Sequence, residues 1–413
     1  MKNKRPATPH RQHGVTLIEM LVGMTIGVIT LLIVTQLFMG TESTKRTVTG
    51  ASDAQQAGSF STYALERHLR LAGTGFSRMN AAIWGCPLKA WRSNAAVVPL
   101  PASLSPASVA YVNHFKTPID AGLAGQQLRV TPVLIINGGG NTDADAGSPT
   151  PDTLIVMAGQ HESATLPYKS TGTPPSATTA SIRNTVGINQ NDLLIARDID
   201  PTPGVTDCRV VQATDAVAPP TAVGVVPNPL NFAGGTYTPS SGTQALSGYS
   251  ATFDIGNLGA NPAFMAYSLG SDGTTPDSLL TYDLFGGRLA SLADNIVNLQ
   301  AAYGVAAAWN SPDIAAWQAP TGAWSASTLM DGTAASADKI QRIRAVRLAI
   351  VARSAQYEKS ADWTAPALPL LSDLSAATPA ANVSMTFSGN AQRFRYRSYD
   401  VVVPLRNMLL KDL

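Results

Sequence analysis

The sequence predicts an α+β fold, in which one long amino-terminal helix precedes a β-rich head of antiparallel strands joined by long loops. Three observations lead to this prediction. An apolar run over residues 15–40 continues as a proline-free amphipathic stretch to residue 72. After Gly73, short β-like runs alternate with clusters of Pro, Gly, Ser and Thr. Near the carboxyl end lie two longer runs of β-forming residues, 340–353 and 393–405.

Residues 15–40 have the length and composition of a membrane-spanning helix. At about 1.5 Å per residue they reach roughly 39 Å, which exceeds a hydrocarbon core of about 30 Å. The preceding segment carries Lys2, Lys4, Arg5 and Arg11 without any acid, as expected of a cytoplasmic flank. No small-residue cleavage site closes the run, and no nearby cysteine could accept a lipid. We therefore expect a retained anchor.

Glu19 is the single ionisable residue of this run. A carboxylate inside a membrane helix costs on the order of 2.5 to 3.5 kcal/mol on insertion scales, so it normally has a partner. A cut after Gly14 would free an α-amino group at Val15, and we expect such an amine to be that partner. The alternative is an ordinary anchor with an isolated glutamate.

This junction resembles that of type IV prepilins. It reads GVTLIEMLV at 14–22, behind a short basic leader and ahead of a long apolar helix. The resemblance implies that a prepilin peptidase removes residues 1–14 by cutting after Gly14, and that Val15 is then N-methylated. It also implies that Glu19 attracts the amino terminus of a neighbouring subunit during assembly. Val15 departs from the family pattern, which most often has Phe at this position.

Gly23 and Gly27 form a Gly-x-x-x-Gly step in the same helix, and two interpretations stay open. The spacing permits close packing of two helices. Because each glycine costs about 1 kcal/mol relative to alanine, the step could instead be where the helix unwinds inside a filament.

Residues 41–72 are expected to carry the helix onward from the membrane. Leu65, Leu69 and Ala72 recur at helical spacing, and Gly73 and Gly75 are positioned to end the helix. The expected helix therefore covers 15–72, with 15–40 in the membrane and an apolar stripe of the second half packed on the head.

The head is expected to occupy 73–413, and a change of pattern near residue 285 would allow two lobes, 73–285 and 286–413. From Leu289 we expect a short helix or turn that leads into a strand. The expected strands are 127–136, 153–157, 192–196, 209–212, 264–267, 279–283, 296–305, 340–353 and 393–405.

The carboxy-terminal segments extend the resemblance to one family, the PilW-type minor pilins. They read NLQAAYGV at 298–305, RAVRLAIVARS at 344–354 and LRN at 405–407, and the segments LRLAG at 69–73 and Gly85-Cys86 are also similar. Residues 91–276 match no known pattern. The resemblance implies a pilin-like fold and a low-abundance subunit near the pilus tip that takes part in biogenesis, adhesion and twitching motility.

The partners implied are the major pilin, other minor pilins, prepilin peptidase, the inner-membrane assembly machinery and a tip adhesin. The implied location is the bacterial inner membrane, as a single-pass protein with a periplasmic head, and later the extracellular pilus. Two alternatives are a J-type minor pseudopilin of a type II secretion system and a membrane-anchored periplasmic adhesin.

Charge and composition argue against a nucleic-acid partner. The chain of 413 residues has 29 Lys and Arg against 27 acids, and loss of the leader removes four bases and no acid. The mature chain would therefore carry 25 bases and 27 acids, a net charge of −2, which provides no global attraction to polyanions.

Cys86 and Cys208 both follow the membrane segment, on the side opposite the basic leader. An oxidising compartment would allow a disulfide between them, which stabilises by about 4 to 5 kcal/mol on the chain-entropy model. Two separate buried thiols are the alternative.

A weak calcium pattern is formed by Asn141, Asp143, Asp145 and Asp152, whose oxygen ligands recur at alternating spacing. The glycine is one place late, so a solvated acidic turn is the favoured interpretation. No metal or other cofactor is predicted.

A basic ridge is possible if the last two long strands pair. Its members would be Lys339, Arg342, Arg344, Arg347, Arg353, Arg393, Arg395 and Arg397. One interpretation is contact with DNA or an acidic subunit, and the other is a solvated strand face that discourages edge aggregation.

Catalytic motifs are missing from the sequence. There is no Gly-x-Ser-x-Gly, the five histidines are scattered, and Gly138-Gly139-Gly140 is followed by acids instead of a lysine and a helix. We therefore expect a protein that is not an enzyme.

Overall fold

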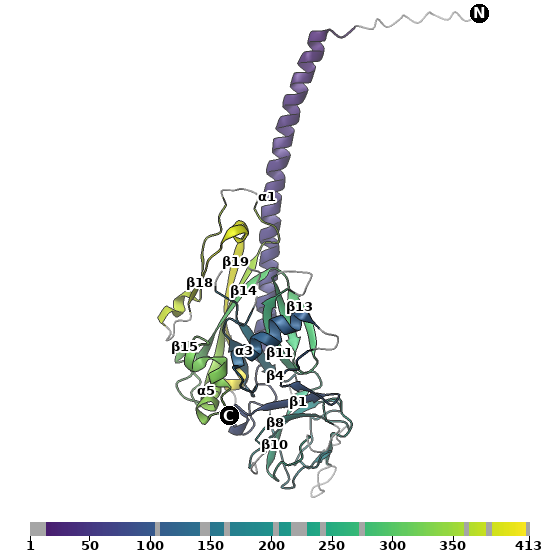
Figure 1. Ribbon diagram of the computed structural model, residues 1–413, viewed down its shortest axis with the longest axis vertical. Helices are drawn as coiled ribbons and strands as arrows, with labels where there is room; N and C mark the ends of the chain where they lie inside the picture. The colour runs from purple at the N-terminus through teal and green to yellow at the C-terminus, as the bar shows by residue number, and fades with distance from the viewer. Residues whose placement is uncertain are drawn as a thin grey trace, which may run out of the picture. The chain divides into compact units, whose positions relative to one another are not determined.

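The computed structural model describes residues 14–103, 108–140, 149–160, 166–200, 206–215, 229–239, 245–271, 277–358, 363–376 and 382–409. The chain forms two compact units, Met1–Gly50 and Ala51–Leu413. The first contains an apolar helical segment, and the second contains the β-sheets (Figure 1).

Helix α1 runs from Leu17 to Leu71, a length of 55 residues. It begins two residues after the start predicted from the sequence and ends one residue early. Gly73 and Gly75 follow with φ of 84° and 87°, a left-handed conformation that glycine adopts without steric cost. The two glycines therefore end the helix, as predicted.

A six-stranded sheet has the order β2-β1-β8-β7-β10-β5. Its strands are β1 (Leu88–Arg92), β2 (Ala95–Val98), β5 (Tyr168–Lys169), β7 (Leu193–Asp198), β8 (Cys208–Gln212) and β10 (Phe253–Gly259). Strands β1 and β8 pair in parallel, and the other pairs are antiparallel.

A five-stranded antiparallel sheet has the order β13-β12-β11-β4-β3. Its strands are β3 (Val133–Ile136), β4 (Thr153–Ala158), β11 (Ala263–Gly270), β12 (Ser278–Asp283) and β13 (Arg288–Ala293). The prediction of a short helix or turn from Leu289 was wrong, because this residue lies in strand β13. Because β12 and β13 pair with each other, the boundary expected at 285/286 lies inside a hairpin and does not separate two lobes.

A four-stranded antiparallel sheet has the order β15-β14-β16-β19. Its strands are β14 (Ile296–Val305), β15 (Ala316–Gln318), β16 (Ile343–Arg353) and β19 (Tyr396–Pro404). The two carboxy-terminal strands predicted from the sequence thus lie side by side. The first residues of the predicted strand 340–353 belong instead to the end of helix α5.

Short elements complete the second unit. The helices are η1 (Ala81–Ile83), α2 (Val109–Tyr111), η2 (Val112–Lys116), α3 (Thr117–Leu123), η3 (Gly322–Trp324), α4 (Ala326–Leu329), α5 (Ala334–Gln341), η4 (Ser372–Ala376), η5 (Gly389–Arg393) and α6 (Arg406–Leu409). Two small sheets pair β6 (Thr179–Ala180) with β9 (Leu230–Asn231), and β17 (Leu368–Leu370) with β18 (Val383–Met385).

The main core joins the second half of α1 to the sheets. Leu65 and Leu69 are fully buried and belong to the same apolar cluster as Ile155 of β4, Leu299 of β14 and Leu348 of β16. The apolar stripe predicted for residues 41–72 therefore packs on the head, and the burial of such side chains is a main source of stability.

Candidate processing and assembly site

The junction before α1 combines a non-helical segment with a helix cap. Gly14, Val15 and Thr16 are not helical. The Thr16 hydroxyl accepts a hydrogen bond from the Glu19 N–H at 3.3 Å, and a Glu19 carboxylate oxygen accepts one from the Thr16 N–H at 3.1 Å. The same carboxylate oxygen also accepts from the Thr16 hydroxyl at 3.0 Å. This is a capping box, a reciprocal pair that satisfies two amide groups of the first turn.

The cap was missed by the interpretation of the sequence, although Thr-x-x-Glu ahead of an apolar run is its signal. It means that Glu19 has an internal partner before any neighbouring subunit arrives.

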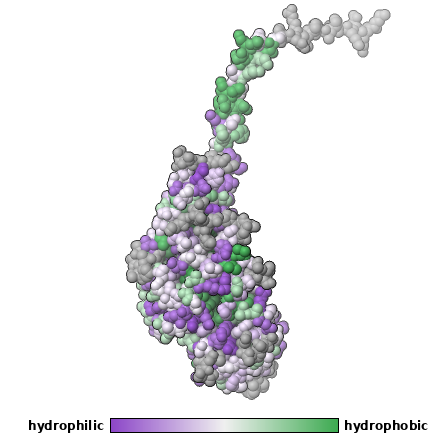
Figure 2. Space-filling view, in the orientation of Figure 1, coloured by the Kyte–Doolittle hydropathy of each residue, from purple (hydrophilic) through white to green (hydrophobic). Residues whose placement is uncertain are grey.

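The first half of α1 exposes an apolar surface. Leu17–Glu42 has a mean hydropathy of 2.4 and none of it is buried within the chain. Leu17, Leu31 and Phe38 are 80, 67 and 70% exposed. Hydrophobic surface covers most of this segment in Figure 2, whereas it is interspersed with polar surface in the second unit. An apolar surface of this kind requires lipid or other subunits around it.

Polar side chains within the segment are satisfied locally. The hydroxyls of Thr25, Thr30 and Thr35 donate to the backbone carbonyls of Val22, Ile26 and Leu31 at 2.7 to 2.8 Å. The threonines thus add no unsatisfied donor to an apolar environment, where each would cost free energy.

Gly23 and Gly27 are open on all sides, since a Cβ added at either would meet no atom within 4 Å. Among the described residues nothing requires glycine at these positions, and both interpretations of the step remain predictions.

The second half of α1 is built differently. A Cβ at Gly58 would overlap the ring of Tyr399 on β19, and the Tyr399 hydroxyl donates to the Gln55 carbonyl at 3.1 Å. This glycine allows the helix to approach the sheet closely. Figure 1 shows this part of α1 beside β19.

Asn407 closes the end of α1. Its side-chain amide donates to the carbonyls of Leu71 and Ala72 at 3.2 and 3.1 Å, and to the Thr74 hydroxyl at 2.8 Å. Carbonyls of the last helical turn have no partner within the helix. The Leu71 carbonyl also accepts from the N–H and the hydroxyl of Thr74, so Asn407 adds a further donor there and supplies one to Ala72. The LRN segment at 405–407 thus ties the carboxyl end of the chain to α1. No local sequence signal could have indicated this role.

Cys86 and Cys208 form the predicted disulfide, with their Cα atoms 5.8 Å apart. Cys208 opens β8 and lies in register with Leu88 of β1, so the bond joins the two parallel strands at their start.

The calcium prediction is only partly covered by the structure. Asn141, Asp143 and Asp145 lie outside the described residues. Asp152 is fully buried, and its two carboxylate oxygens accept hydrogen bonds from the N–H groups of Gly138 and Ala301 at 3.0 and 2.8 Å. Burial raises the pKa of Asp152 to about 7. This carboxyl group links the start of β4 to β14.

The arginines of the predicted basic ridge are largely paired. Arg347 forms ion pairs with Asp373 and Asp400, and Arg353 pairs with Asp277. Arg395 pairs with Glu358, and Arg342 with Asp338. The side-chain N–H groups of Arg344 donate to backbone carbonyls. Four of the eight predicted members thus pair with an acid, and three of these, Arg347, Arg353 and Arg395, pair with an acid distant in the sequence.

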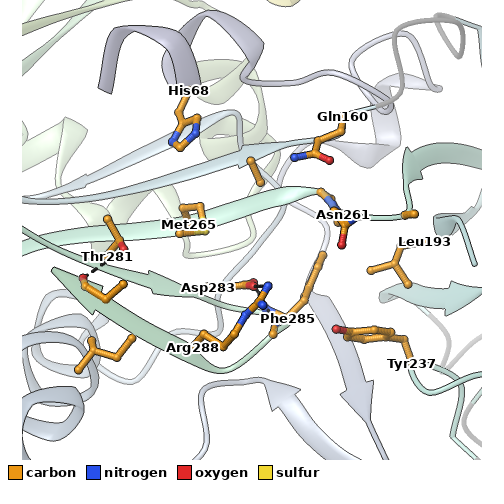
Figure 3. A pocket seen from close by; sticks show the side chains of 16 residues that line it. His68, Gln160, Leu193, Tyr237, Asn261, Met265, Thr281, Asp283, Phe285 and Arg288 are labelled. Carbon is orange, nitrogen blue, oxygen red and sulfur yellow. Dashed lines mark hydrogen bonds and ion pairs between the residues drawn. The ribbon is translucent and has the colours of Figure 1, made fainter. Parts of the chain in front are cut away.

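A pocket of about 490 Å³ opens in the second unit beside β11, β12 and β13 (Figure 3). Asp283 and Arg288 point toward each other on its wall, and Asp283 also accepts hydrogen bonds from the N–H groups of Phe285 and Gly286 at 3.1 and 2.9 Å. On another side His68 contacts the Tyr267 hydroxyl through Nδ1, and burial lowers the pKa of His68. These groups hold the β12–β13 turn and the end of α1 in place.

Comparison with known proteins gives two family matches, one near each end of the chain. Residues 9–35 match the prokaryotic N-terminal methylation motif, and residues 267–407 match the type IV pilus-assembly protein W family, PilW. No curated protein and no solved structure matches the chain.

An apolar amino-terminal helix with a prepilin junction, followed by a β-rich head, defines a type IV pilin-like protein that is membrane-anchored. The carboxy-terminal match extends over β14, β16, β19 and Asn407, the elements that hold α1 in the head. The carboxy-terminal part of the chain is similar to the PilW family, and the two matches together support a role as a minor pilin of a type IV pilus.

Proposed function

We propose that this protein is a minor pilin near the tip of a type IV pilus, where it helps to start assembly and contributes to adhesion and twitching motility. It acts as a structural subunit and not as an enzyme. The observation that carries the proposal is the first half of α1, whose large apolar side chains face outward. Such a surface suits storage in a bilayer followed by burial among the helices of other subunits.

In this proposal the subunit waits in the inner membrane with its head in the periplasm. Prepilin peptidase cuts after Gly14 and Val15 is methylated. Two observations support this orientation: the basic residues lie ahead of the helix, and the Cys86–Cys208 disulfide belongs to an oxidising compartment. The carboxy-terminal family match favours a pilus over the pseudopilus of type II secretion.

Glu19 is proposed to exchange its internal cap for the α-amino group of a neighbouring subunit. Two variants separate these two roles of the carboxylate. Glu19→Gln keeps an oxygen that can accept the Thr16 N–H, because Gln also forms capping boxes, but it removes the charge. Glu19→Ala removes both.

We expect both Glu19 variants to be cut after Gly14 but to enter pili poorly. Cleavage is measured by mass spectrometry of the mature amino terminus, and entry by immunoblot of sheared pili. Normal incorporation of Glu19→Gln would show that only the cap matters and would contradict amine pairing. If the wild-type chain is found uncut and unmethylated, the proposed function itself is contradicted. Immunogold labelling of the head along the filament instead of at its end would contradict the tip position.

A further inference from the structure

Strand β19 is the long, regular edge of the four-stranded sheet. It pairs on one side with β16 in unbroken register from Tyr396 to Pro404. The edge strands of the other two large sheets are short or bulged: β2, β3 and β5 have 4, 4 and 2 residues, and β13 shifts its register against β12. At the opposite edge of its own sheet, β15 has 3 residues. Proteins commonly use such short or irregular edges to prevent pairing with other chains.

The alternation of hydrogen bonds shows which groups of β19 face outward. Leu405 N–H donates to the Arg344 carbonyl and Ser354 N–H to the Arg395 carbonyl, so the odd-numbered residues of this strand bond to β16. The N–H and C=O groups of Ser398, Asp400 and Val402 therefore point away from the sheet. They have no backbone partner among the described residues. Pro404 continues the outward series, where its missing N–H disturbs no bond to β16.

The side chains along this edge suit a protein strand. Ser398 is exposed, Val402 is 45% exposed, and the Asp400 carboxylate is already paired with Arg347. A neighbouring strand would therefore meet a small polar group, a carboxylate held in an ion pair and an apolar surface. At the start of the edge is a hollow of about 200 Å³, whose lining includes Ala51 and Ala54 of α1, Trp363, and Arg395 and Arg397 at this end of the strand. Strand addition derives its affinity from the backbone and its specificity from hollows of this kind.

The edge is fixed to the part of the protein that assembles. Tyr399 of β19 bonds to Gln55 of α1, and the segment after β19 caps the end of α1 through Asn407. Strand β19 is therefore held to the second half of α1 within the same unit.

We propose that the outward edge of β19 binds an extended strand from the head of a different pilus subunit, which adds a fifth strand to this sheet. The inference rests on the proposed function, because it takes the partner from the same filament. The partner strand donates to and accepts from Ser398, Asp400 and Val402, and an apolar side chain next to it fills the hollow beside Ala54.

The test places a photo-crosslinking amino acid, p-benzoyl-phenylalanine, at Ser398 of the full chain in piliated cells. A crosslinked adduct with another pilus subunit, identified by mass spectrometry, is expected. In the same background Val402→Pro removes an outward N–H and leaves the bonds to β16 intact, whereas Val402→Thr keeps the N–H and the branched shape. Adduct yield should fall about tenfold in the proline variant, from the lost hydrogen bond and the clash of the ring, and persist in the threonine variant.

Three outcomes would overturn the strand addition: no adduct with a pilus subunit, adducts only between copies of this chain, or equal yields in the two Val402 variants. The unfolding transition of each variant is measured in parallel as a control for folding. If Val402→Pro does not fold, the comparison is repeated with Ser398→Pro and the photo-crosslinking residue placed at Val402. A wild-type chain that is cut and present in sheared pili, but forms no adduct, contradicts this inference alone. A chain absent from pili contradicts the proposed function.

Discussion

The two halves of α1 have the same secondary structure and opposite surroundings. From Leu17 to Glu42 the large apolar side chains face outward, and a Cβ at Gly23 or Gly27 would contact nothing. From Ala51 to Leu71 the helix buries Leu65 and Leu69 and contacts Tyr399 through Gly58. The comparison shows that hydrophobicity alone does not assign a helix to a core. The first half presents its apolar side chains to contacts outside the chain. The second half buries its apolar side chains against the head.

Leu69→Ala should have the largest effect on the head. Leu69 is fully buried, so truncation leaves a cavity and lowers the free energy of unfolding by about 2 to 5 kcal/mol. Denaturant unfolding of the detergent-solubilised full chain, followed by the fluorescence of the buried Trp84 and Trp324, measures it. Leu31→Ala in the first half is the matched control and should leave this transition unchanged. Equal effects of both substitutions would contradict the difference between the halves.

Asn407→Ala should have the next largest effect. The Ala72 carbonyl loses its donor, at a cost of about 1 to 3 kcal/mol, whereas the Leu71 carbonyl keeps its hydrogen bonds from Thr74. Arg406→Ala changes an exposed neighbour and serves as the control. Hydrogen exchange at the last turn of α1 should become faster in Asn407→Ala and stay the same in Arg406→Ala. An unchanged exchange rate in Asn407→Ala would contradict the capping role.

Gly58→Ala should destabilise the head by about 1 kcal/mol, since the new methyl group pushes against the Tyr399 ring. Gly27→Ala meets no atom and should leave head unfolding unaffected. A second substitution, Tyr399→Ala, should make Gly58→Ala neutral or stabilising, because alanine favours the helix once the ring is gone. Additive losses in the double variant would argue against the contact.

A pH effect is the smallest that we expect. Burial lowers the pKa of His68, so the folded state favours its neutral form. The associated stability is present above the unfolded value of about 6.5 and is lost as the pH falls through that value toward the lower folded pKa. His114 is also buried and its pKa is likewise lowered, so the difference between wild type and His68→Gln is the quantity to measure. A pH profile that His68→Gln does not flatten would contradict the assignment.

The ends of the chain could be predicted from the sequence because local rules determine them. The apolar run, the glycines after α1, and the regular β-forming segments that became β14, β16 and β19 all carry strong periodic signals. The disulfide followed from the only possible pairing of two cysteines.

Strand β10 shows why the middle was harder to predict. It reads FDIGNLG, which combines an acid, an amide and two glycines and has weak β-propensity, yet all seven residues are buried. Lys169 neutralises Asp254, Asp192 accepts from Asn257, and a Cβ at Gly256 would overlap the Gly75 carbonyl. These partners are distant in sequence, so no local pattern reveals the strand. The same holds for the distant acids that pair with arginines of the predicted basic ridge.

The capping box also bears on the timing of maturation. The bond after Gly14 lies outside the helix, just ahead of the first helical residue, Leu17. A peptidase that cuts there needs no unwinding of the helix, so processing carries no penalty from local unfolding. The proposed cut after Gly14 would leave Thr16 and Glu19 together in the mature chain, so the first turn of the helix would keep its cap before and after processing.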